Sequence, residues 1–142
     1  MTPNFKLFTL AEAERTLPLV RRIVDDLTTE YPLWRAAVAK FELLTGGTRA
    51  EAGESPELVA TRETVSRHAD RINEYLRELE AIGCVFKGFD AGLVDFYSLR
   101  DDRSIFLCWK LGEPHITHWH EIDAGFAGRQ PIDAAILSAT RS

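Results

Sequence analysis

The segment GLVDFYSLRDDRSIFLCWKL, residues 92–111, decides the fold that the sequence predicts. It contains two runs rich in apolar and aromatic residues, 93–99 and 104–111, on either side of a charged stretch. Two such runs separated by a short polar turn indicate an antiparallel hairpin. If Asp101 and Asp102 form a two-residue turn, Asp95 lies opposite Cys108 in this hairpin.

This register places the strong hydrophobes of both strands on one face. Because successive side chains point to opposite faces, the other face then carries Asp95 beside Cys108. A slip of one residue would separate the pair, and Asp-Asp is a weaker turn signal than Asn-Gly, so the register is conditional. The residues predicted for the apolar face are Val94, Phe96, Leu107 and Trp109.

Further short strands flank the hairpin. Residues 84–87 are predicted to form a strand before it, residues 88–92 a glycine-bounded turn, and residues 116–122 a fourth strand after it. The pattern is typical of a three- to four-stranded antiparallel β-meander over residues 84–122. The tail, 123–142, begins with glycines, becomes weakly helical, and is expected to be loose at its end.

A helix is predicted before the sheet, over residues 9–45. Thr9 and Glu12 have the spacing of a capping box, in which each side chain bonds a backbone N–H of the first turn. Pro18 leaves two arrangements open, a short helix followed by another or one helix with a kink. Pro32 lies off the apolar stripe and should bend the helix near its middle. The stripe has heptad spacing and consists of Val20, Val24, Leu27, Tyr31, Trp34, Val38 and Phe41.

A second helix is predicted over residues 56–82. Ser55 suits its N-cap, Pro56 its first position, and Gly83 the left-handed residue after its end. The small and polar stretch 48–55 is the loop between the two helices. The stripe of this helix again has heptad spacing and consists of Leu58, Arg62, Val65, Ala69, Ile72, Leu76 and Leu79.

Together the helices are expected to form a long antiparallel hairpin that outgrows the small sheet. Part of its apolar seam would then stay uncovered, so we expect the hairpin to pack against a second copy in a homo-oligomer. The predicted fold class is α+β, with a single domain over residues 1–142.

The composition argues against several classes of protein. A formal net charge of −5 does not suit a nucleic-acid binder, which needs basic surface to neutralise phosphates. No apolar run approaches the roughly 20 residues that span a bilayer, so no membrane association is expected. Residues 1–6 lack the features of a signal peptide, which makes the cytoplasm the expected compartment.

The two cysteines, Cys84 and Cys108, are too few for a disulfide framework. Both lie in apolar runs, which favours buried thiols over reactive or ligating ones. The sequence has no nucleophile elbow and no phosphate-binding loop, and a thiolate pair between Cys108 and a histidine is not required by the spacing. The three tryptophans are interpreted as packing residues and His68 as a surface residue.

The densest chemistry lies in GEPHITHWHE, residues 112–121, with three of the four histidines. Imidazole and carboxylate groups suit a divalent transition metal such as zinc or iron. On a strand, His118 and His120 share one face and Trp119 and Glu121 the other. The alternative is a solvated or structural polar cluster, with Asp95 paired or turned to solvent. The candidate metal ligands are His120, Glu121, Glu113, His118, Asp95 and His115.

Five short motifs run through the chain: FTLxEA with LP at residues 8–18, GLVDF at 92–96, LCWKLGE at 107–113, WHE at 119–121, and GRQPI at 128–132. They resemble a bacterial family catalogued as domain of unknown function number 2203, over almost the whole chain. The resemblance implies no activity. Its pattern leaves out His115 and His118, and therefore favours Glu113, His120 and Glu121 as a shared site. The matching polar positions are Asp95, Cys108, Glu113, His120, Glu121 and Arg129.

Two hypotheses about function follow. The first is an oligomerising interaction module, in which the polar residues form a structural network and Glu121 or Asp95 pairs with Arg129. The second is a metal-binding protein or metal-dependent enzyme with a His/carboxylate site in residues 113–121, where an open position receives water or substrate. The sequence assigns no catalytic residue.

Overall fold

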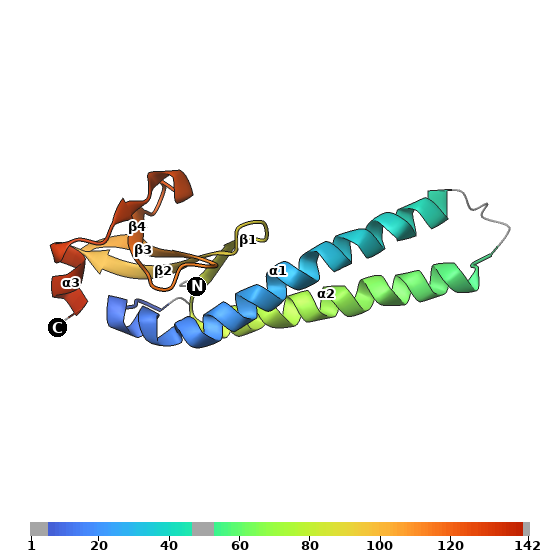
Figure 1. The fold of residues 1–142 in the computed structure, drawn as a ribbon, viewed down its shortest axis with the longest axis horizontal. Coiled ribbons are helices and arrows are strands. Elements are labelled where there is room, and N and C mark those ends of the chain that lie inside the picture. The colour runs from blue at the N-terminus through green and yellow to red at the C-terminus, as the bar shows by residue number, and fades with distance from the viewer. Residues whose placement is uncertain (1–5, 47–52, 141–142) are drawn as a thin grey trace, which may run out of the picture.

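Two long helices form an antiparallel hairpin that leads into an antiparallel sheet (Figure 1). The computed structural model describes residues 6–46 and 53–140. The α+β fold class predicted from the sequence is confirmed. Among the helices in these described ranges, none has both the length and the apolar character that crossing a membrane requires. The elements are α1 (Leu10–Gly46), α2 (Pro56–Ile82), β1 (Val85–Gly88), β2 (Leu93–Arg100), β3 (Arg103–Lys110), β4 (His118–Glu121), the 3-10 helix η2 (Phe126–Gly128), β5 (Gln130–Pro131) and α3 (Ala134–Thr140).

Helix α1 begins with the predicted capping box. The Thr9 N–H donates to Glu12 Oε1 at 2.9 Å, and the Glu12 N–H donates to Thr9 Oγ1 at 3.1 Å. Of the two arrangements that Pro18 left open, the single helix is the one observed, and it continues past Pro32 as well. Figure 1 shows α1 changing direction within its first half, as expected where a proline removes an intrahelical hydrogen bond.

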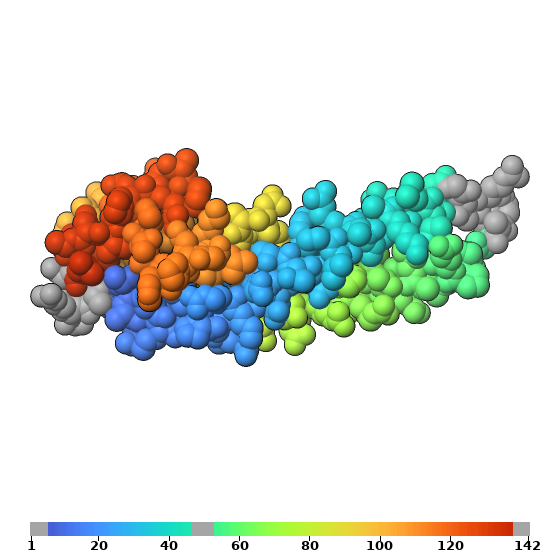
Figure 2. Space-filling view, viewed as in Figure 1, coloured from blue at the N-terminus to red at the C-terminus, as the bar shows by residue number. Residues whose placement is uncertain are grey.

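Helix α2 has both predicted caps. Ser55 Oγ accepts from the Leu58 N–H at 3.1 Å, and Gly83 ends the helix at φ 105°, a conformation that favours glycine. Most of the loop predicted over residues 48–55 lies outside the described residues. The 37 residues of α1 span about 55 Å at 1.5 Å per residue, so the hairpin extends well beyond the sheet (Figure 2).

The apolar stripe of α1 is most fully buried where it lies near the sheet. Val20, Val24 and Leu27 are fully buried, whereas the stripe beyond them is only half-buried. The interpretation of His68 as a surface residue is wrong. Its ring is 17% exposed and pairs through Nδ1 with the buried carboxylate of Glu30, which contacts His68 from the facing helix.

The sheet has five strands in the order β1-β2-β3-β4-β5, one more than the predicted three to four. The predicted register of the central hairpin is confirmed, since Asp95 pairs with Cys108. The turn residues Asp101 and Asp102 have φ values of 51° and 66°. A type I′ turn, which matches strand twist, needs positive φ at both central positions, and aspartate tolerates this better than most residues.

One face of the sheet packs on the first half of α1. The four hydrophobes predicted for this face, Val94, Phe96, Leu107 and Trp109, are all fully buried, and they share a cluster with buried residues of α1. The opposite face carries Asp95, Cys108 and His120, and the segment after β4 lies over part of it. The fold therefore separates an apolar face from a face that holds buried polar groups.

The tail is more structured than the sequence indicates. Strand β5 pairs with β4, and the Trp119 indole N–H donates to the Pro131 carbonyl at 3.1 Å. Helix α3 contributes Ile136, which is 1% exposed, to the main core. The expected helical character of the tail is confirmed by α3, whereas strand β5 was not predicted, and residues 141–142 at the end of the tail lie outside the described residues.

Candidate metal centre

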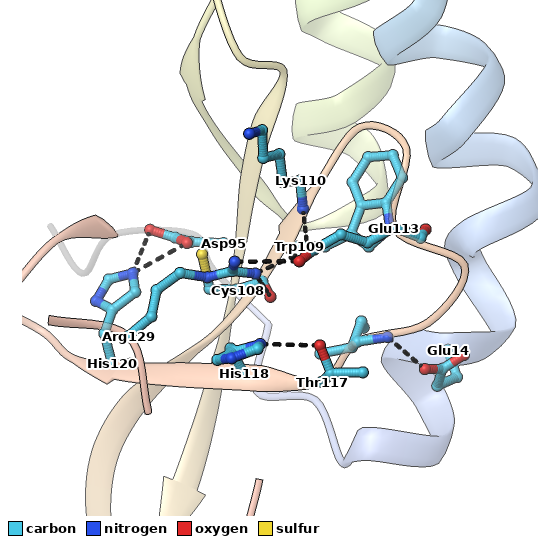
Figure 3. A network of polar contacts seen from close by, with 11 residues as sticks. Glu14, Asp95, Cys108, Trp109, Lys110, Glu113, Thr117, His118, His120 and Arg129 are labelled. Carbon is cyan, nitrogen blue, oxygen red and sulfur yellow. Dashed lines mark hydrogen bonds and ion pairs between the residues drawn. The ribbon is translucent and has the colours of Figure 1, made fainter. Parts of the chain in front are cut away.

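Three adjacent strands each contribute one polar side chain to a buried cluster. Asp95 comes from β2, Cys108 from β3 and His120 from β4, and their exposed fractions are 2%, 1% and 2%. One ligand atom from each residue lies within 4.8 Å of the other two (Figure 3). The side chains meet because all three positions point to the same face: Asp95 lies opposite Cys108, and His120 is two residues along β4 from the partner position of Cys108.

The ring of His120 has a partner at each nitrogen. Its Nδ1 lies 2.7 Å from the carbonyl oxygen of Glu121, and its Nε2 lies 3.1 Å from both carboxylate oxygens of Asp95. A carbonyl oxygen only accepts, so Nδ1 carries a hydrogen and donates it. A neutral His120 then directs its Nε2 lone pair at a carboxylate that also only accepts. A proton or a metal cation must therefore lie between the two groups.

Cys108 completes the cluster as a thiol that does not ionise easily. Burial raises its pKa to about 12; the charge of Asp95 acts in the same direction, and Arg129 opposes it. Near neutral pH the thiol is therefore protonated, which argues against a free thiolate nucleophile. A coordinating metal ion removes that proton, because the sulfur ligand of a metal is a thiolate.

Arg129 lies beside Cys108 and is held there by Glu113 (Figure 3). Its Nη2 donates to Glu113 Oε1 at 2.7 Å and to the Cys108 carbonyl at 3.1 Å, and its Nη1 donates to Glu113 Oε2 at 3.1 Å. The expected pairing of Arg129 with Glu121 or Asp95 is therefore wrong. Within the described part of the chain, the buried Nε of Arg129 has no hydrogen-bond acceptor.

The Glu113 loop is itself fixed to strand β3. The Trp109 indole N–H donates to the Glu113 carbonyl at 2.8 Å, and the Lys110 N–H donates to Glu113 Oε1 at 2.8 Å. Glu113 thus positions Arg129 and is not one of the clustered groups.

Replacing Glu113 by glutamine is expected to make folding less sensitive to acid. Burial would raise the pKa of Glu113, but hydrogen bonds from Arg129 and from the Lys110 N–H outweigh it and lower the pKa from 4.5. The stabilisation is present above pH 4.5 and is lost as the pH falls through the folded-state pKa. Urea unfolding below pH 4.5 should therefore show a shallower loss of stability in the variant than in the unchanged protein. Equal pH dependence in the two proteins would contradict this role.

The remaining sequence candidates are not among the clustered groups. His115 pairs with Glu14 of α1 at 3.2 Å, and Glu121 pairs with Arg103 at 2.8 Å. His118 shares the face of His120, as predicted for alternating strand positions, but its Nδ1 contacts the Thr117 hydroxyl at 2.8 Å. The structure thus brings together Asp95 and His120 from the candidate list and adds Cys108. The signal for Cys108 was the strand register that puts it opposite Asp95.

A pocket opens directly over the cluster. Its volume is about 320 Å³, close to the lower end of ligand pockets, and one wall comes from the segment after β4. Apolar side chains and one lysine surround the three polar groups. The lining residues are Lys87, Leu93, Asp95, Cys108, His120, Ile122, Gly125 and Phe126.

Among the comparisons with known proteins, the one that gives a match is the comparison with protein families. The family described as "Uncharacterized conserved protein (DUF2203)" matches residues 6–132. No curated protein and no solved structure matches the chain. The match includes all three clustered residues, their neighbour Arg129 and its partner Glu113.

Proposed function

The chain belongs to the uncharacterised DUF2203 family, so its function has to be inferred from the site, and we propose that it binds one divalent transition metal ion through Asp95, Cys108 and His120. The observation that carries the proposal is the pairing of His120 Nε2 with Asp95. Two groups that can only accept lie 3.1 Å apart in a buried site, and a cation between them resolves the conflict.

The separation of His120 Nε2 and the Asp95 carboxylate fits a small tetrahedral ion. Nitrogen and oxygen ligands of a tetrahedral zinc ion lie roughly 3.3 Å apart, and the observed separation of 3.1 Å needs little adjustment. His120 also has the outer contact that metal-bound histidines use, since its other nitrogen donates to a backbone carbonyl. That contact fixes the ring with Nε2 toward the ion.

Zinc suits this donor set best. It accepts sulfur, nitrogen and oxygen ligands together, whereas open iron sites more often use two histidines and a carboxylate. The Arg129 guanidinium already lowers the pKa of Cys108 against the effect of burial, and would stabilise the thiolate in the same way. Three protein ligands beside a pocket leave the fourth position of the ion open to water or substrate, as in catalytic zinc sites.

The competing occupant of the site is a proton. Asp95 and His120 would then form a buried ion pair that only supports the fold. This reading gives no role to Cys108, to the charge of Arg129 beside it, or to the pocket over the cluster. The two occupants are distinguished by whether sulfur becomes a ligand.

Cobalt(II), a spectroscopic stand-in for zinc, is expected to give a sulfur-to-metal charge-transfer band in the near ultraviolet. Cys108→Ser should remove the band and weaken binding, because a hydroxyl is a poor replacement for a thiolate. Cys84→Ser is the matched control: Cys84 is also buried, and its thiol contacts the Leu79 carbonyl. A band that is absent, or that disappears with Cys84 instead, would rule out the proposed site.

A second proposal concerns self-association of the hairpin, favoured by apolar side chains on its outer half. Leu33 and Leu43 are 51% and 79% exposed, and they lie ten residues apart, about three turns along α1. Beyond the contact of Tyr31 with Phe89 of the β1–β2 turn, this part of the hairpin extends away from the sheet (Figure 1). Exposed apolar side chains along paired helices are covered in coiled-coil assemblies by another helix pair, here from a second copy of the chain.

Changing Leu33 and Leu43 together to lysine is expected to convert a dimer into a monomer at micromolar concentration. In the dimer the two new lysine ammonium groups would be buried without partners, whereas in the monomer water solvates them. Sedimentation equilibrium measures the change. Leu137→Lys, at a 48% exposed position on α3, should leave the dimer intact. An unchanged protein that is already monomeric would contradict self-association.

A further inference from the structure

We propose that the pocket over Asp95, Cys108 and His120 binds a small organic monocarboxylate, with the carboxylate beside Lys87 and an apolar body against Phe126. This inference rests on the metal site proposed above and names the class of ligand that would reach its open position. The residues that line the pocket support this ligand class: they provide a single cation, apolar side chains and three metal-binding groups.

Lys87 is the charged residue at this pocket that has no counterion. Among the described residues, no carboxylate lies within ion-pair distance of its ammonium group, which is 5.1 Å from the centre of the Phe106 ring. The nearby guanidinium groups are already used, since Arg129 pairs with Glu113 and Arg103 with Glu121. An anion entering the pocket would therefore find Lys87 available.

The charge of the metal site limits the ligand to one negative charge. A divalent ion held by the Asp95 carboxylate, the Cys108 thiolate and a neutral His120 has no net charge. Lys87 is then the one positively charged side chain among the residues that line the pocket. A carboxylate matches this charge, whereas a phosphate monoester carries between about 1.5 and 2 negative charges at neutral pH.

The apolar wall indicates that the ligand is more than a bare anion. Ile122 and Phe126, which line the pocket with Leu93, are each 45% exposed. A short alkyl or aryl chain would cover these surfaces, and each methylene group buried there would strengthen binding about fourfold. The volume of about 320 Å³ suits a molecule of a few carbon atoms.

Calorimetric titration of the zinc-loaded full chain tests the inference with hexanoate, acetate, hexanamide and inorganic phosphate. Hexanoate should bind at least about tenfold more tightly than acetate, because four more methylene groups contact the wall. Hexanamide, which lacks the charge, should bind more weakly than hexanoate. Lys87→Met should weaken hexanoate binding about fivefold. Lys40→Met, on the outer hairpin, should leave it unchanged.

Three results would overturn the inference: equal binding of hexanoate and hexanamide, no effect of Lys87→Met, or tighter binding of phosphate than of hexanoate. Zinc content measured on the same samples distinguishes failure of the carboxylate proposal from failure of the metal site. Retained zinc without hexanoate binding refutes the ligand class alone. Lys87-dependent hexanoate binding in a chain that retains no zinc refutes the metal site and leaves the carboxylate pocket standing.

Discussion

Replacing Trp109 by alanine is expected to lower the free energy of unfolding by about 3–5 kcal/mol, in the range found for large aromatic side chains in cores. Trp109 is fully buried between the sheet and α1. Its indole N–H also donates to the Glu113 carbonyl, so the variant loses the contact that fixes the loop holding Arg129. Urea unfolding followed by circular dichroism measures the change.

The matched control for Trp109 is an exposed apolar residue. Leu137→Ala, at a 48% exposed position, should change the free energy of unfolding by no more than about 0.5 kcal/mol. A loss below about 1 kcal/mol for Trp109→Ala would contradict the assignment of Trp109 to the core that supports the site.

Replacing Asp95 by asparagine is expected to weaken zinc binding by at least about 100-fold, since removing a ligand should cost more than the 10- to 100-fold typical of outer contacts. The same change should leave the metal-free protein within about 1 kcal/mol of its original stability. The asparagine amide can donate to His120 Nε2 and so satisfies the ring without a proton or a metal ion. Competition with a chelating dye and urea unfolding measure the two effects.

This variant separates a metal ligand from a structural ion pair more cleanly than His120→Ala. Truncating His120 would leave the 2% exposed Asp95 carboxylate without its partner, so loss of metal and loss of folding would be confounded. Glu121→Gln is the control, because the Glu121 side chain pairs with Arg103 outside the cluster. Zinc binding that survives Asp95→Asn would contradict the proposed ligand set.

The parts of the fold that depend on local patterns were predictable from the sequence. The capping box at Thr9 and the left-handed Gly83 follow from residue chemistry alone. The pairing of Asp95 with Cys108 followed from a two-residue turn and from the requirement that hydrophobes share one face. That single register determined two of the three residues of the candidate site.

The parts that depend on distant packing were not predictable. The loop between β3 and β4 has no two-residue turn to fix the register, so nothing in the sequence brought His120 toward Asp95 and Cys108 specifically. The burial of His68 depends on Glu30 from the facing helix. Helix α3 has only seven residues, too few for a periodic pattern to distinguish the buried Ile136 from the exposed Leu137.

The density of histidines in residues 112–121 also favoured candidate ligands that lie outside the observed cluster. His115 and Glu121 are close to His120 in sequence, but they contact Glu14 and Arg103 respectively. Ligands gathered from three strands are adjacent across the sheet and distant along the chain. For this reason sequence spacing alone could not identify the set Asp95, Cys108 and His120.

Native mass spectrometry of the full chain, purified without a histidine tag and dialysed against zinc, tests the metal site most directly. One zinc ion per chain is expected in the unchanged protein and in Glu121→Gln, and none in a folded Asp95→Asn variant. A folded, unchanged protein that carries no zinc would contradict the account and leave Asp95 and His120 as a structural ion pair.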